Sequence, residues 1–123
     1  MPDLERLRWI AEAEFLALVR STTMVRDKLR VVLNDGSYID FWWSTQIPGR
    51  YAYHWERRHV DGTIYSHDNM PHPQWQGIQS FPKHFHAGDQ DTVLDSTLPA
   101  DPEQALREFL LFAARKIAEE GRR

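Results

Sequence analysis

The sequence contains no cysteine. A disulfide framework and a thiolate metal site are therefore both excluded, and the chain fits a reducing compartment. A long apolar run is also missing, because the N-terminal stretch MPDLERLRWIAEAEF mixes acidic and basic side chains with apolar ones. It lacks the apolar core of a signal peptide and the roughly 20 apolar residues of a membrane span. We therefore expect a soluble, cytoplasmic protein without a membrane partner.

Excess positive charge is missing as well, since the formal net charge is -3. No global positive field draws the protein towards nucleic acid, so any contact with RNA needs a local basic patch. The candidates for such a patch are Arg50, Arg57, Arg58 and Lys83, whereas Arg122 and Arg123 are more simply a solubilising tail at the end of a helix.

What is present is globular composition. Apolar residues make up 41% and charged residues 27% of the 123 residues, which separates the chain from disordered sequences. A chain of this length fits one domain, so we expect residues 1–123 to form a single α+β domain.

Two segments have the apolar periodicity of amphipathic helices. The first is predicted over residues 3–20. The second begins near Asp101, which is a plausible N-cap, with Pro102 at the first helical position and Gln104 at the capping-box position. Gly121 lies just past its end.

Between the helices, two stretches alternate as β-hairpins do. In the first, a three-residue loop at 34–36 with Gly36 left-handed sets Leu29, Val31 and Leu33 opposite Phe41, Ile39 and Ser37, which unites the apolar side chains on one face. The second hairpin turns at Asp61 and Gly62. With a possible fifth strand in DTVLDS, the order predicts an antiparallel meander of four to five strands packed against N- and C-terminal helices.

The second hairpin is also a candidate catalytic site. A two-residue turn at 61–62 places His54, Glu56 and Arg58 on one face with Tyr65 and His67, and sets Glu56 directly opposite His67. A glutamate there raises the pKa of the histidine, while tyrosine and arginine could contact a phosphate, as general acid-base cleavage requires. Two alternatives remain open: the polar residues simply cover the solvent side of a sheet, or the connection is a three-residue loop, which breaks the cluster.

The segment HFH is the second constellation. His84 and His86 point the same way on an extended chain, so they could chelate zinc with His72 or Asp68 as a third ligand. The same histidines could instead belong to a loop pinned by aromatic and proline packing.

Residues 67–88 contain three prolines, which stiffen the chain and keep it from forming a continuous helix or a central strand. We expect an ordered, mostly irregular segment along the sheet edge. Phe81 and Phe85 should be buried anchors, and His84 and His86 should face the same pocket as His54.

Four motifs between residues 51 and 88 resemble the TumE-type toxin-antitoxin family. They are YAYHW, the Asp61-Gly62 turn, DNMPH and FPKHFHAG, in that order. Family members often carry histidine where this chain has Pro73 and Lys83, and alanine where it has Met70, so a role of those family histidines does not transfer here.

The resemblance implies a small cytoplasmic toxin encoded beside an antitoxin, acting on RNA. Carried onto matching positions, it indicates the functional set His54, Trp55, Asp68, Asn69, His72, His84 and His86. Together with the residue patterns, it predicts a metal-independent endoribonuclease without a cofactor. The assigned roles are catalysis by His54, Arg58, Tyr65, His67, His84 and His86, and substrate binding by Trp55, Arg57, Asp68, Asn69, His72 and Lys83.

Two alternatives come from other classes of protein. One is a non-enzymatic module that binds a protein partner, either the antitoxin or a second copy in a homodimer. The other is a histidine-rich zinc-binding protein in which His72, His84 and His86 are the ligands.

Overall fold

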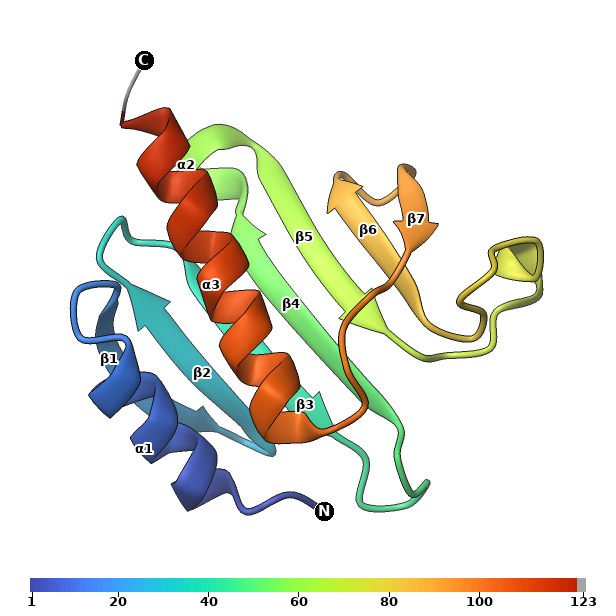
Figure 1. Ribbon diagram of the computed structural model, residues 1–123, viewed down its shortest axis with the longest axis horizontal. Helices are drawn as coiled ribbons and strands as arrows, with labels where there is room; N and C mark the ends of the chain where they lie inside the picture. Colours follow the sequence, from blue (N-terminus) through green and yellow to red (C-terminus); the bar gives the residue numbers. More distant parts are fainter. Residues whose placement is uncertain (122–123) are drawn as a thin grey trace.

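A computed structural model of the chain describes residues 1–121, and the predicted tail of Arg122 and Arg123 lies outside the described residues. Seven strands form one antiparallel sheet in sequential order, and α1 and α3 lie side by side on one of its faces (Figure 1). The elements are α1 (Leu4–Glu14), β1 (Val19–Val25), β2 (Lys28–Leu33), β3 (Tyr38–Trp43), β4 (Tyr51–Arg57), α2 (Arg58–Asp61), β5 (Thr63–Asp68), the 3-10 turn Pro73–Trp75, β6 (His84–Gly88), β7 (Val93–Asp95) and α3 (Pro102–Glu120).

The predicted α+β class and the helices at both ends are confirmed, but the sheet has seven strands instead of four or five. Strand β1 was missed because residues 15–20 continue the apolar spacing of α1, yet the helix ends at Glu14 and the chain turns back into an edge strand. Strand β6 was missed because three prolines precede it within residues 71–82; it begins at His84, two residues after Pro82. Strand β7 falls within the predicted DTVLDS segment.

The C-terminal helix begins as predicted. The Asp101 carboxylate accepts the backbone N–H of Gln104 at 3.0 Å, and Pro102 follows at the first helical position. The face of α3 that meets the sheet contains Leu106, Phe109 and Leu110, all fully buried. These side chains cover the aromatic face of the sheet, where Phe41 and Phe109 pack edge to face with 6.2 Å between their ring centres.

The first hairpin also has the predicted register: Leu29 pairs with Phe41, Val31 pairs with Ile39, and Gly36 has a φ of 90°. In the second hairpin the predicted two-residue turn is wrong. The connection contains the helical turn α2 and Gly62, so Tyr53 pairs with His67 and Trp55 pairs with Tyr65. This register gathers the aromatic rings of both strands on the helix-covered face, as burial of apolar surface favours.

A buried arginine joins three parts of the chain. The guanidinium of Arg57, only 1% exposed, pairs with Asp61 at 2.8 Å, with Glu120 at 2.7 Å and with Asp35 at 3.1 Å. It also lies 4.6 Å from the ring centre of Trp55. Arg57 therefore ties the turn between β2 and β3, the turn between β4 and β5, and the end of α3 into one cluster. The hydrogen bonds that Arg57 donates to Glu120 raise the pKa of Arg57 further.

We expect Arg57→Met to lower the free energy of unfolding by about 3 kcal/mol, because it leaves three carboxylates without their shared cation. Urea unfolding followed by tryptophan fluorescence measures this loss. The matched control is Arg107→Met, which removes the more exposed ion pair with Glu14 and should lower the free energy of unfolding much less, because solvent screens exposed charges. Equal losses in the two variants would show that Arg57 is not a special anchor.

Candidate functional site

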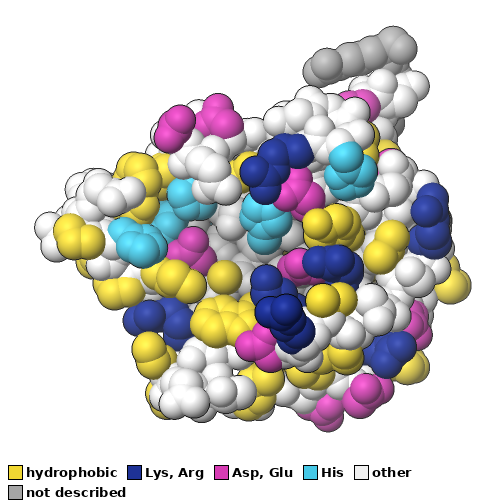
Figure 2. Space-filling view, turned by 180° about the vertical axis from the view of Figure 1, so that it is seen from behind, with side chains coloured by type: hydrophobic (Ala, Val, Ile, Leu, Met, Phe, Trp, Pro, Cys, Tyr) yellow, Lys and Arg dark blue, Asp and Glu magenta, His cyan; other side chains and the backbone are white. Residues whose placement is uncertain are grey.

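The face of the sheet opposite the helices has a polar row that runs across five strands. Register places Arg30 of β2 beside Asp40 of β3, Asp40 beside His54 of β4, His54 beside Ser66 of β5, and Ser66 beside His86 of β6. Figure 2 shows this face, with histidine and charged side chains gathered across its middle. We call these five residues the polar row. Because side chains alternate along a strand, the row points away from the helices while Tyr53 and Trp55 point towards them.

The middle of the polar row is a histidine with a carboxylate neighbour. The Nε2 atom of His54 lies 3.2 Å from Oε1 of Glu56, and the His54 side chain is 29% exposed. Glu56 is held in turn by the exposed Arg58, whose guanidinium and backbone N–H donate to it at 2.6 and 2.9 Å. The hydrogen bonds from Arg58 lower the pKa of Glu56 to about 2, so Glu56 is a carboxylate at neutral pH.

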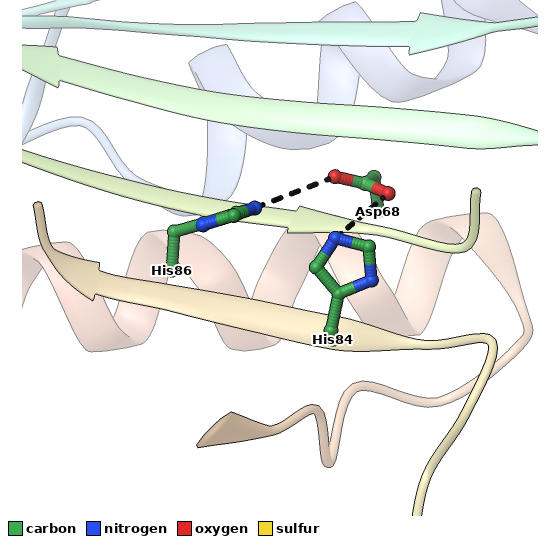
Figure 3. Close-up of side chains that lie close together, drawn as sticks. All are labelled: Asp68, His84 and His86. Carbon is green, nitrogen blue, oxygen red and sulfur yellow. Dashed lines mark ion pairs between the residues drawn. The ribbon is translucent and has the colours of Figure 1, made fainter. Parts of the chain in front are cut away.

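At one end of the row, His86 also belongs to a second cluster, which it forms with Asp68 and His84. Asp68 is the last residue of β5 and pairs with His84 across the strands. Figure 3 shows both imidazoles rising from β6 towards the Asp68 carboxylate. The His84 Nε2 atom is 3.2 Å from Oδ1 of Asp68, and the His86 Nε2 atom is 4.0 Å from Oδ2. We call these three residues the β5-β6 cluster.

His54, His84 and His86 therefore lie on the same face of the sheet, but they line different hollows. His54 borders a hollow of about 320 Å³ together with Asp40, Trp42 and Met70. His84 and His86 border another, of about 540 Å³. The predicted single pocket is thus replaced by two neighbouring hollows on one face.

The segment from 67 to 88 is ordered as expected, yet it is strand at both ends, and only residues 69–83 are irregular. Phe81 and Phe85 are half-buried, less than predicted. Phe85 packs on the helix side, stacked on the ring of His67 with 4.2 Å between ring centres.

Tyr65 and His67 do not share the face of His54, so the predicted cluster around Glu56 and His67 is wrong. His67 is 7% exposed, and its Nδ1 atom lies 2.8 Å from the Ser96 hydroxyl. Burial lowers the pKa of His67 to about 3, aided by the nearby charge of Lys83, in the opposite direction to the prediction. Tyr65 packs against Trp55 and Phe112. Both side chains belong to the packing between sheet and α3.

Four predicted substrate-binding residues have structural contacts instead. Trp55 is fully buried and donates its indole N–H to Ser37, and Arg57 is the buried anchor described above. Asn69 accepts the N–H of Tyr51 at 2.9 Å and donates to the Gly49 carbonyl at 2.8 Å, which fixes the loop before β4. The ammonium group of Lys83 donates to the carbonyl of Leu98, a core residue.

The other two predicted substrate-binding residues, Asp68 and His72, are on the open side. Asp68 joins the β5-β6 cluster, and His72 is exposed on the irregular segment with its ring centre 6.2 Å from that of His84. Of the basic residues predicted to contact RNA, Arg58 is exposed on this face, while Arg50 is half-buried in the loop before β4.

Sequence reasoning missed Asp40 and Ser66. Asp40 pairs with Arg30 through two hydrogen bonds of 2.8 and 3.0 Å, and Ser66 lies in the row between His54 and His86. The alternation of the first hairpin already placed Asp40 opposite the apolar face, so Asp40 could have been found. Ser66 could not, because its position depends on the register of the second hairpin.

The pKa of Glu56 can be measured directly. We expect Arg58→Met to raise the pKa of Glu56 from about 2 towards its ordinary value of 4.5, since Arg58 is the main cause of the lowering. Carboxyl chemical shifts followed by NMR from neutral pH downwards report this titration. As a control, Arg30→Met removes a guanidinium from the same face that contacts Asp40 and not Glu56, and should leave the Glu56 titration nearly unchanged. An unaltered titration in Arg58→Met would contradict the assignment.

Comparison with known proteins agrees with the motifs. No curated protein and no solved structure matched the chain significantly. Among residues 1–121, no helix combines the length and apolar character needed to cross a membrane. The family model described as Toxin TumE matches residues 3–118, which is nearly the whole chain and includes α1, all seven strands and all but the last two residues of α3. The chain therefore belongs to the TumE toxin family.

Proposed function

We propose that this chain is the toxin of a toxin-antitoxin pair and that it cleaves RNA on the open face of its sheet. The observation that carries the proposal is the polar row, which sets His54 between Asp40 and Ser66 on the face that the helices leave free. Membership in a family of toxins supports the biological role.

His54 is the residue best placed to move a proton. A carboxylate beside an imidazole holds the ring in one orientation and stabilises the positive charge that the ring gains when it accepts a proton. Glu56 is such a carboxylate, 3.2 Å away. With 29% of its side chain exposed, His54 can reach a 2'-hydroxyl group laid over the row, whereas His67 is buried behind the sheet.

Arg58 is the candidate contact for the RNA phosphate. Its side chain is 61% exposed and stands beside Glu56 on the same face as His54. The chain has a net charge of -3, which repels RNA as a whole. A local contact such as Arg58 must therefore attract the phosphate against this repulsion. As the 2'-oxygen attacks the phosphorus atom and the bond to the 5'-oxygen breaks, the leaving oxygen takes its proton from water, which reaches this open face.

Three finer parts of the proposal do not rest on the polar row. The metal-independent reaction predicted from the sequence requires that cleavage continue in the presence of a chelator. The antitoxin partner rests on the family, and the homodimer stays a prediction.

We expect His54→Ala to reduce RNA cleavage by the purified chain about 100-fold or more, the usual contribution of a general acid or base. The assay follows a labelled RNA, and growth after induced expression in a bacterial host without antitoxin gives the second readout. The matched control is His59→Ala, which removes an exposed histidine of α2 whose Nε2 atom binds the Gly36 carbonyl. It should cleave and arrest growth as the wild type does.

Full activity in His54→Ala would remove the row from the mechanism. A folded wild-type chain that leaves RNA intact would overturn the ribonuclease and favour the module that acts by binding a partner.

A further inference from the structure

The β5-β6 cluster has the composition and spacing of a metal site. One carboxylate oxygen of Asp68 and one ring nitrogen each of His84 and His86 all lie within 4.8 Å of one another. The two strands hold them there: Asp68 faces His84 in the ladder, and His86 is two residues further along the same face of β6. The three donors therefore converge on one point beside the sheet.

Backbone carbonyls fix which nitrogen of each ring points inwards. The Nδ1 atom of His84 lies 3.1 Å from the Pro82 carbonyl, and the Nδ1 atom of His86 lies 2.9 Å from the Gln90 carbonyl. A carbonyl can only accept, so each Nδ1 carries the hydrogen and donates it. In the neutral rings both Nε2 atoms then present lone pairs to Asp68. Histidines that bind metals characteristically donate their other ring N–H to a carbonyl or carboxylate in this way.

The inward nitrogen of His84 has no hydrogen-bond partner among the described residues, although the side chain is only 1% exposed. Asp68 Oδ1 is 3.2 Å away, but the direction is unsuitable for a hydrogen bond, and this oxygen already accepts the N–H of Met70 at 2.9 Å. Two lone pairs and an anion that meet in a largely buried place repel one another unless a cation lies between them. A metal ion satisfies all three donors at once.

The donor set selects the kind of ion. Two imidazole nitrogens with one carboxylate suit zinc, iron(II) and neighbouring transition metals, whereas magnesium and calcium prefer oxygen ligands throughout. Three protein ligands leave at least one coordination position open. The hollow of about 540 Å³ lies on this open side, bordered by Gln74, Trp75, Gln90 and Asp91.

We propose that Asp68, His84 and His86 bind one divalent transition-metal ion through a carboxylate oxygen and two Nε2 atoms, with an open position towards the adjoining hollow. The site goes beyond the proposed RNA cleavage and does not depend on it. It selects Asp68 as the third ligand that the sequence left open between Asp68 and His72.

Metal binding is tested without RNA. The purified chain, stripped with a chelator and dialysed, is titrated with Zn²⁺ and Co²⁺ by calorimetry, and the Co²⁺ complex is followed by its visible absorption. We expect one ion per chain, and no comparable binding of Mg²⁺. Two variants should weaken Zn²⁺ binding by about 100-fold or more, because each removes a ligand and even the loss of an outer partner costs up to that factor.

The first variant is His86→Gln, at a side chain that is 12% exposed, and the second is Asp68→Asn, which keeps an oxygen to accept the Met70 N–H. The matched control, His59→Gln, should bind as the wild type does, and circular dichroism verifies that all variants are folded. Zn²⁺ binding that is unchanged in both variants, absent in the wild type, or equalled by Mg²⁺ would overturn the proposal. If the chain binds metal but cleaves no RNA, the result supports this metal site and contradicts only the proposed RNA cleavage.

Discussion

The pairing of β4 with β5 is the constraint on which the rest of the molecule depends. Side chains alternate between the two faces of a sheet, so a shift of one residue would exchange every side chain of β5 and of the strands that follow it. In the observed register, Tyr53, Trp55, Tyr65 and His67 all face α3. The same pairing sends His54, Ser66, Asp68, His84 and His86 to the opposite face. The same register therefore determines both the core and the candidate site. Burial of the aromatic side chains selects this register, because it removes far more apolar surface from water.

Features with a local cause could be predicted from the sequence. The start of α3 follows from Asp101 and Pro102, whose contacts lie within one helical turn. The first hairpin follows from Gly36 and from an apolar pattern that permits only one register. The position of the second hairpin could be predicted, but the register of its two strands could not. Its connection is stabilised by the ion pair of Arg57 with Asp61, and Arg57 also pairs with Glu120 from the far end of the chain. No rule of turn residues contains that long-range contact.

The residues predicted for the candidate site also fall into two groups, those that lie on the open face of the sheet and those that belong to the core. His54, Asp68, His84 and His86 were identified by residue type and motif, and the structure brings them to one face. Trp55, Arg57, Lys83 and His67 looked equally functional in the sequence, since aromatic and charged residues near histidines suit both a site and a core. Burial alone does not separate the two groups, because His84 is as enclosed as Arg57 and His67. The face of the sheet separates them: Arg57 and His67 contact α3, whereas His84 faces Asp68 on the open side. The irregular path of residues 69–83 was predicted by its prolines, but the return of the chain as β6 depends on pairing with β5, which no local signal encodes.

The sequential order of the strands has a consequence for how the chain folds. Each strand pairs with its neighbour in sequence, so most of the sheet forms from contacts that are close along the chain, an arrangement associated with rapid folding. The exception is α3, which contacts α1 from the opposite end of the sequence and supplies Leu106, Phe109 and Leu110 to the core. During synthesis this helix leaves the ribosome after all seven strands of the sheet. Until it docks, the aromatic face of the sheet stays exposed, so the nascent chain is most prone to aggregate between the emergence of the sheet and that of α3.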